Sequence, residues 1–311
     1  MIQVENLTKY YGDVCAVSQI NIDIPGGEIL GLLGPNGAGK TTTLRMLTGF
    51  LKPTSGTVRV KEYRIEDHAL EIKKILGYLP ESAPLYHEML VFDYLQYVAG
   101  IREIPRPQRL ARIRHLADLC GLNEVMHKPI AELSKGYRQR VGLGHAMMND
   151  PEILILDEPT SGLDPNQIVE IRDIIREIGR EKTVILSTHI LSEAEATCDR
   201  VVIINQGKIV ADGNLDTLKQ SAGDSSLVHM ALTNAAFEDV ETRLGKVDGV
   251  REVLQVSEQD GHLRLQLATP VDRDLRPQIY DAVKQTDWIL LEMRQETQTL
   301  ETIFRELTRE N

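Results

Sequence analysis

A loop that could bind a polyphosphate is the clearest chemical feature of the sequence. Gly34–Thr41 reads Gly-Pro-Asn-Gly-Ala-Gly-Lys-Thr, which has the spacing Gly, four residues, Gly, Lys, Ser/Thr. A strand-like apolar run precedes it and a helix-like run follows it, so backbone N–H groups would converge on an anion. We expect Lys40 to reach the β- and γ-phosphates and the Thr41 hydroxyl to hold Mg²⁺. The alternative is a glycine-rich turn without a ligand, and both the Lys-Thr pair and the flanking runs argue against it.

Carboxylates end two further apolar runs of strand length. Glu152–Leu156 is followed by Asp157 and Glu158, and Ile75–Leu79 is followed by Pro80 and Glu81. Adjacent carboxylates at the end of a buried strand are costly unless a cation or solvent meets them. Ligands of open α/β sheets collect at the carboxyl ends of the strands. A Mg²⁺-nucleotide at this edge is therefore the expected partner.

Two helix starts carry polar caps. Ser134 is placed to cap a helix whose first residues include Lys135, and two readings stay open for this segment. It is either an ordinary capped helix with a solvated basic face or a second anion site. Asp164 and Pro165 begin another helix, which we expect to run to about Gly179.

The chain is long enough for one large domain and a smaller one, and we place the boundary within 212–225. Residues 1–220 combine short antiparallel strands over 2–30, buried strands typical of a parallel sheet, and a helical insert over about 82–150. Pro105 and Pro107 should separate two helices of this insert. Residues 221–311 are predicted to follow the order strand, helix, strand, strand, helix, strand, which is ferredoxin-like, and to end in a helix over 298–308.

Composition narrows the function classes. The formal net charge is −11, which disfavours a nucleic-acid partner. Cys15, Cys120 and Cys198 have no paired spacing, so we expect reduced thiols rather than a disulfide framework or a zinc site. The N-terminus lacks the pattern of a signal peptide, and no run approaches the roughly 20 apolar residues of a membrane helix. We expect a cytoplasmic protein that would act at a membrane only through a partner.

Taken in order, these motifs resemble those of the ATP-binding subunit of ABC transporters. The resemblance covers residues 1 to about 220. The Pro-Glu pair and the tail Leu300–Thr308 resemble the ABC-2 exporter branch, including its gliding-motility and multidrug-like members. The resemblance implies an α/β P-loop NTPase fold, the ABC cassette, with an antiparallel β subdomain and a helical insert. The resemblance to the ABC ATP-binding subunit depends on five motifs: Gly34–Thr41, Leu133–Tyr137, Asp157–Glu158, Ser161–Asp164 and His189.

The resemblance also implies a role for each motif residue. Glu158 would be the general base, His189 would sense the γ-phosphate, and Thr41, Asp157 and Glu81 would serve the metal. Tyr11 would stack on adenine; from the residues alone, its exposed ring could equally cover the sheet edge. Ser134, Lys135 and Gly136 would bind ATP held by a second copy, and Asp164 would lie in the loop between the two copies. The nucleotide would be bound by Tyr11, Gly34, Pro35, Asn36, Gly37, Ala38, Gly39, Lys40, Thr41 and Thr42.

The implied protein is an ATP-hydrolysing motor subunit that forms a homodimer, binds Mg²⁺ and ATP, and drives export through a separate permease. It would lie on the cytoplasmic face of the membrane. The sequence departs from the family where Glu81 replaces the usual Gln, which puts in doubt which atom positions the attacking water, and where Tyr137 replaces another Gln. The alternatives are a soluble ATPase acting on nucleic acid or ribosomes, and a ligand-sensing role for 221–311 in place of dimer contact or permease docking.

Overall fold

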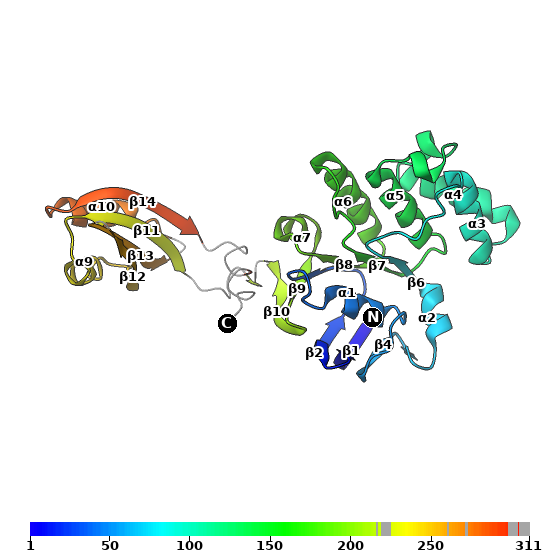
Figure 1. Cartoon of the computed structure of the whole chain (residues 1–311), viewed down its shortest axis with the longest axis horizontal. Coiled ribbons are helices and arrows are strands. Elements are labelled where there is room, and N and C mark those ends of the chain that lie inside the picture. Colours follow the sequence, from blue (N-terminus) through cyan, green and yellow to red (C-terminus); the bar gives the residue numbers. More distant parts are fainter. Residues whose placement is uncertain (216, 219–224, 260, 271–272, 298–303, 305–311) are drawn as a thin grey trace. The chain divides into compact units, whose positions relative to one another are not determined.

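Two units make up the structure, a computed structural model that describes residues 1–215, 217–218, 225–259, 261–270, 273–297 and 304 (Figure 1). The first unit is Met1–Leu215 and the second is Asp216–Asn311. The helix expected over 298–308 lies outside the described residues, apart from position 304. Among the described helices, none is both long enough and apolar enough to cross a membrane.

The buried apolar runs of the first unit form a six-stranded sheet. Its strand order is β10-β9-β3-β8-β7-β6, with five parallel strands and an antiparallel β10 at one edge. The parallel strands have both faces covered, which is why they read as continuous apolar runs. Their carboxyl ends therefore meet at one edge. The strands are β3 (Ile29–Leu33), β6 (Leu76–Leu79), β7 (Ile153–Asp157), β8 (Thr183–Thr188), β9 (Arg200–Asn205) and β10 (Lys208–Asn214).

A second, antiparallel sheet packs with helix α1 against the first. Its order is β2-β1-β4-β5, and alternate residues of β2 are buried, as the alternating sequence predicts. One apolar core joins the two sheets, because Ile2 and Val58 belong to the same cluster as Leu30 and Ile153. The elements are β1 (Ile2–Tyr11), β2 (Val14–Ile24), β4 (Ser55–Val60), β5 (Tyr63–Arg64) and α1 (Lys40–Leu47).

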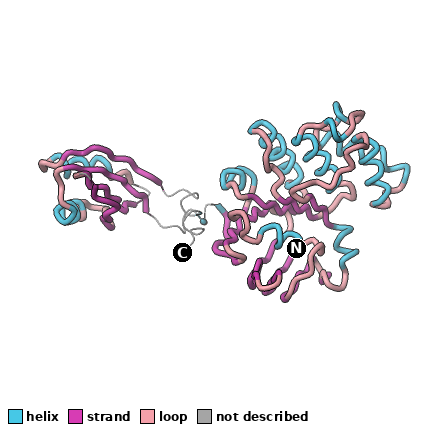
Figure 2. Tube along the Cα trace, in the orientation of Figure 1, coloured by secondary structure: helices cyan, strands magenta, loops and turns pink. Residues whose placement is uncertain are grey.

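Helices cover the other face of the central sheet and form the predicted insert. Figures 1 and 2 show α3, α4 and α5 on the side of the sheet away from β1 and β2. Pro107 does not separate two helices as expected; it lies in the first turn of α4, where its missing N–H is not needed. Pro105 occupies the N-cap position of that helix and offers no side-chain hydrogen bond. The helices of this unit after α1 are α2 (Ala69–Ile75), α3 (Val91–Ile101), α4 (Arg106–Leu119), α5 (Lys135–Ala146), α6 (Pro165–Gly179) and α7 (Leu191–Thr197). Helix α2 instead adds Ile72 to the core shared with the antiparallel sheet.

The second unit has its own core. Its sheet order is β12-β13-β11-β14, every adjacent pair is antiparallel, and Val228, Leu265 and Ile279 are fully buried or nearly so. Two helices contribute Val240, Leu244, Ile279 and Val283 to this core. The elements are β11 (Ser225–Thr233), α9 (Phe237–Leu244), β12 (Glu252–Gln259), β13 (His262–Pro270), α10 (Arg276–Lys284) and β14 (Ile289–Thr297).

Within the helical insert, Tyr94 and His145 join α3 to α5. The Tyr94 oxygen lies 2.7 Å from His145 Nδ1 and 3.2 Å from the Pro84 carbonyl oxygen. Burial, followed by the positive charge of Arg102, lowers the pKa of His145 from 6.5 to about 4. The imidazole is therefore neutral at pH 7.

We predict that this histidine makes the protein acid-sensitive. Between about pH 6.5 and pH 4 the unfolded chain binds a proton that the folded chain does not, so the free energy of unfolding falls as pH decreases through that window. We expect His145 to account for a loss of about 2 kcal/mol between pH 7 and pH 4.5. Urea unfolding at several pH values should show a shallower profile for His145→Gln than for the wild type. Parallel profiles would contradict the assignment.

Candidate functional site

The predicted phosphate loop lies between β3 and α1, at the carboxyl edge of the sheet. Its glycines are required by close approaches of the backbone. A Cβ on Gly39, whose φ is 107°, would lie 2.6 Å from the Ala16 carbonyl oxygen, and one on Gly34 would clash with the carbonyl oxygen of Ile204. Helix α1 begins at Lys40, so the first N–H groups of the helix point toward the loop.

A polar pocket of about 330 Å³ opens over this loop. Residues from three other segments complete its wall: Glu81 after β6, Glu158 and Ser161 after β7, and His189 after β8. The pocket thus unites residues that the sequence places far apart. Its lining from the first strands and the loop is Ala16, Asn36, Gly37, Ala38, Gly39, Lys40, Thr41 and Thr42.

Lys40 carries the main positive charge of the pocket and is 6% exposed. Its Nζ donates to the carbonyl oxygens of Gly34 at 2.7 Å and Pro35 at 3.2 Å, and lies 3.2 Å from Glu158 Oε1. A buried ammonium needs such partners. Lys40 is also the first residue of α1, so a phosphate bound here could meet both its positive charge and the free N–H groups of the helix N-terminus.

Thr41 and Asp157 form an oxygen pair on the floor of the site. The Thr41 hydroxyl donates to Asp157 Oδ1 at 3.0 Å, and Asp157 is 1% exposed. Mg²⁺ prefers hard oxygen ligands such as hydroxyl and carboxylate groups and completes its shell with water and phosphate. The donor set at this position therefore fits the ion, with Glu81, exposed on the pocket wall, within the same site.

Ser187 is a site residue that the sequence analysis missed. It lies opposite Asp157 in the register of β7 and β8 and is fully buried. Its hydroxyl donates to Asp157 Oδ1 at 2.7 Å and accepts from the Glu158 backbone N–H at 2.9 Å. A polar residue near the carboxyl end of an otherwise apolar strand was the signal that could have found it.

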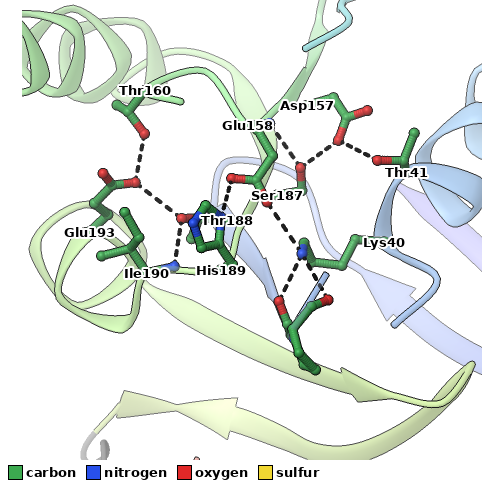
Figure 3. A network of polar contacts seen from close by, with 12 residues as sticks. Lys40, Thr41, Asp157, Glu158, Thr160, Ser187, Thr188, His189, Ile190 and Glu193 are labelled. Atoms are coloured by element: carbon green, nitrogen blue, oxygen red, sulfur yellow. Dashed lines mark hydrogen bonds and ion pairs between the residues drawn. The ribbon is translucent and has the colours of Figure 1, made fainter. Parts of the chain in front are cut away.

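Glu158 and His189 face each other at the pocket edge (Figure 3). His189 Nδ1 lies 2.9 Å from Glu158 Oε2, while Lys40 lies near the other carboxylate oxygen. Glu158 has a φ of 48°, in the left-handed region that non-glycine residues seldom occupy. Its carbonyl accepts from the Ser161 N–H at 3.1 Å, which fixes the turn. The buried carboxylate of Glu158 therefore lies between the Lys40 ammonium and the His189 imidazole.

Other predicted site residues lie outside this pocket. Tyr11, at the end of β1, is 48% exposed, and Lys9 Nζ lies 5.4 Å from the centroid of its ring. Gly34 and Pro35 do not line the pocket; their carbonyl oxygens accept hydrogen bonds from Lys40. Asp157 lies beneath the lining residues and acts through Thr41 and Ser187.

Ser134, Lys135 and Gly136 begin α5, and none of them lines the pocket. The Ser134 hydroxyl accepts from the Tyr137 N–H at 3.3 Å, which confirms the predicted cap. Lys135 lies against Gly162, in the loop that leads to Asp164. Asp164 caps α6, as predicted, by accepting from the Gln167 N–H at 3.0 Å. The two capped helix starts are thus neighbours on the surface.

A glycine loop between a parallel strand and a helix, facing an acidic pair on a nearby strand, defines a P-loop nucleotide-binding protein. A family model described as "ABC transporter" matches residues 17–161. The uncharacterized ABC transporter ATP-binding protein YxlF of Bacillus subtilis is 39% identical over 220 residues, which cover 71% of this chain and 73% of that protein.

The same family appears in a full-length relative and in a solved structure. The ABC transporter ATP-binding protein NatA of Bacillus subtilis is 34% identical over 239 residues, 75% of this chain and 97% of NatA. A structure of the ATP-binding subunit of an ABC transporter matches with a TM-score of 0.65 at 30% identity, over 72% of this chain and 93% of that one. The chain belongs to the ABC transporter family, as an ATP-binding subunit. The P-loop ABC cassette fold expected from the motifs is confirmed.

We predict that Ser187→Ala destabilises the fold, because it leaves the buried Glu158 N–H without its acceptor and removes one donor from Asp157. The expected loss is about 1–3 kcal/mol of unfolding free energy. Chemical denaturation should measure it, with Ser192→Ala on the exposed side of α7 as the control. A change no larger than that of the control would show that the hydroxyl is dispensable.

Proposed function

We propose that this chain hydrolyses ATP as the motor subunit of an ABC transporter. The observation that carries the proposal is the placement of Glu158. Its carboxylate lies at the wall of the phosphate pocket, 3.2 Å from Lys40 Nζ and 2.9 Å from His189 Nδ1. It is next to the Asp157–Thr41 pair that fits Mg²⁺. A carboxylate beside the phosphates is suited to accept a proton from an attacking water.

The chain's own groups would divide the work. The loop backbone and Lys40 would bind the phosphates, and Thr41 with Asp157 would hold the metal. Bound Mg²⁺ would withdraw charge from the phosphate oxygens and fix their orientation. Glu158 would take the proton of the water, and His189 would donate a hydrogen bond to the γ-phosphate. Glu81, on the same wall, would help to place the water or the metal.

The adenine would be bound at the edge of the pocket. Tyr11 offers an exposed ring near the turn from β1 to β2, and Ala16 on β2 lines the pocket. Stacking on such a ring is available to any purine and needs no hydrogen-bond pattern.

We also propose that the site is completed by a second copy. Ser134, Lys135 and Gly136 do not line their own pocket, yet they offer a helix N-terminus and a lysine suited to an anion. Two copies arranged head to tail would bring this segment to the partner's ATP, with Asp164 and its loop between them. To shift the open and closed forms from 1:99 to 99:1, ATP must favour the closed form by about 5.5 kcal/mol.

The membrane partner in this proposal is a separate permease, bound on its cytoplasmic side. The helical insert presents two exposed aromatic residues whose ring centroids lie 5.5 Å apart, Tyr86 at 52% and Tyr97 at 44% exposure, which suits a docking surface. The proposal that transport is export, and that the chain belongs to the ABC-2 branch, is based on the resemblance of the Pro80–Glu81 pair and of the C-terminal tail to that branch. The net charge of −11 argues against a nucleic-acid partner.

For the second unit we propose a ferredoxin-like accessory domain. Its strand–helix–strand–strand–helix–strand order and its antiparallel β12-β13-β11-β14 sheet support that class. Its place in the function would be contact with the second copy or with the permease.

We predict that Glu158→Gln lowers the turnover of ATP by about 10²–10⁴-fold, because the amide cannot accept the proton. Binding of a fluorescent ATP analogue should stay within about threefold of the wild type, since Lys40 and the loop remain in place. Phosphate release and equilibrium binding measure the two effects, and Glu181→Gln, at an exposed position just after α6, is the control. Hydrolysis at the wild-type rate would refute Glu158 as the base.

Dimer formation tests the second-copy proposal. Ser134→Asp should keep the helix cap, because Asp caps helices as well as Ser does, but it would place a negative charge toward the partner's γ-phosphate. In the Glu158→Gln background, ATP should produce a dimer by light scattering, and adding Ser134→Asp should abolish it. Ser192→Asp is the matched control. A dimer that persists with Ser134→Asp would contradict the model.

A further inference from the structure

A carboxylate outside the pocket joins two of the loops that form its wall. Glu193, on α7, accepts hydrogen bonds at a single oxygen, Oε2, from Thr160 Oγ1 at 2.6 Å and Thr188 Oγ1 at 3.0 Å (Figure 3). Thr160 follows Glu158 and Pro159 after β7, and Thr188 ends β8 directly before His189. Glu193 thus bridges the loop of the proposed base and the loop of the histidine that contacts it.

The Thr188 hydroxyl depends on Glu193 for its orientation. Thr188 is fully buried, and its Oγ1 also accepts from the Ile190 backbone N–H at 3.0 Å. A hydroxyl has one proton, so accepting from Ile190 is compatible with donating to Glu193. The residues on both sides of His189 are therefore fixed by one hydroxyl, and that hydroxyl is fixed by Glu193.

His189 needs such a support because its side chain is 41% exposed. Its side chain makes a polar contact through Nδ1, which lies 2.9 Å from Glu158 Oε2. A ring on the edge of a solvent-filled pocket keeps its direction only if its backbone is held. The two hydrogen bonds to Glu193 are charge-assisted, which makes them stronger than bonds to a neutral acceptor.

Hydrogen bonds from the described residues satisfy only one of the two carboxylate oxygens of Glu193. Its second oxygen, Oε1, is buried and has no hydrogen-bond partner among the described residues. A buried carboxylate oxygen without a donor is unfavourable. Glu193 also borders a recess of about 300 Å³ that is lined by Ile168, Ile175 and Arg172. Within the described part of the chain, no cationic side chain forms an ion pair with Glu193. The hydrogen bonds that link the two loops through Oε2 are thus made although Oε1 stays without a donor.

We infer that Glu193 is a positioning residue that holds His189 against Glu158 and links the His189 loop to the loop running from Thr160 to Asp164. Because Asp164 lies in the proposed contact with a second copy, the link gives that contact a direct path to the histidine. The inference rests on the proposed hydrolysis at Glu158 for its effect on turnover. The hydrogen-bonded link between the two loops does not depend on that proposed hydrolysis.

Substitution of Glu193 should alter turnover without altering nucleotide affinity. Glu193→Ala removes the acceptor of both hydroxyls and should lower kcat about tenfold, with KM for ATP within twofold. Glu193→Gln keeps an oxygen that can accept and should restore kcat to within about threefold of the wild type. Glu181→Ala is the control. Thermal unfolding of each variant should confirm that it is folded at the assay temperature.

Epistasis separates positioning from a general structural role. Since Glu193 acts through His189, adding Glu193→Ala to His189→Ala should cause no further loss of kcat. A residue that only supports the fold would lower kcat by the same factor in both backgrounds. A further tenfold loss in the His189→Ala background would overturn the inference, as would an unchanged kcat for Glu193→Ala in the wild type.

Hydrogen exchange tests the link without ATP. In Glu193→Ala, the amides of residues 188–191 should exchange at least threefold faster than in the wild type, because the Ile190 N–H loses a fixed acceptor. If Glu193→Ala shows this faster exchange but the wild-type protein does not hydrolyse ATP, the proposed function is refuted and the link is retained. Unchanged exchange in Glu193→Ala would overturn the link even if the protein is an active ATPase.

Discussion

The site is built around a carboxylate that is buried inside a parallel sheet. Asp157 is 1% exposed, and a charge at that depth must be met by donors. Two hydroxyls meet it at one oxygen, Thr41 from the start of α1 and Ser187 from the neighbouring strand. Because these donors come from separate elements, satisfying Asp157 fixes the glycine loop, β7 and β8 in one relative arrangement. The pocket follows from that arrangement.

Contiguous motifs were the predictable part of the structure. The glycine loop, the Asp157–Glu158 pair and the two caps at Ser134 and Asp164 each depend on residues close in sequence. The left-handed φ of Gly39 and the missing N–H of Pro165 act locally, so the residue types alone indicate the conformation. The alternation of β2 and the apolar runs of the parallel strands gave the two kinds of sheet for the same reason.

The hydroxyls that support the site could not be predicted in the same way. Ser187 and Thr188 are unremarkable in a strand sequence, and their partners depend on which strand lies beside β8 and in what register. Glu193 bridges two loops whose proximity follows from that strand order. Pro107 was misjudged for a different reason: proline both ends helices and suits their first turn, so its position relative to the helix start decides its effect.

The positive φ of Glu158 has a consequence for how this protein would respond to selection. A residue with a side chain costs about 1 kcal/mol or more in that region, whereas glycine occupies it freely. A glycine at this position would relieve the strain, but it would also remove the carboxylate that pairs with the buried Lys40 ammonium. Selection for folding stability alone would therefore not replace Glu158 by glycine, because breaking a buried ion pair costs more than the backbone strain.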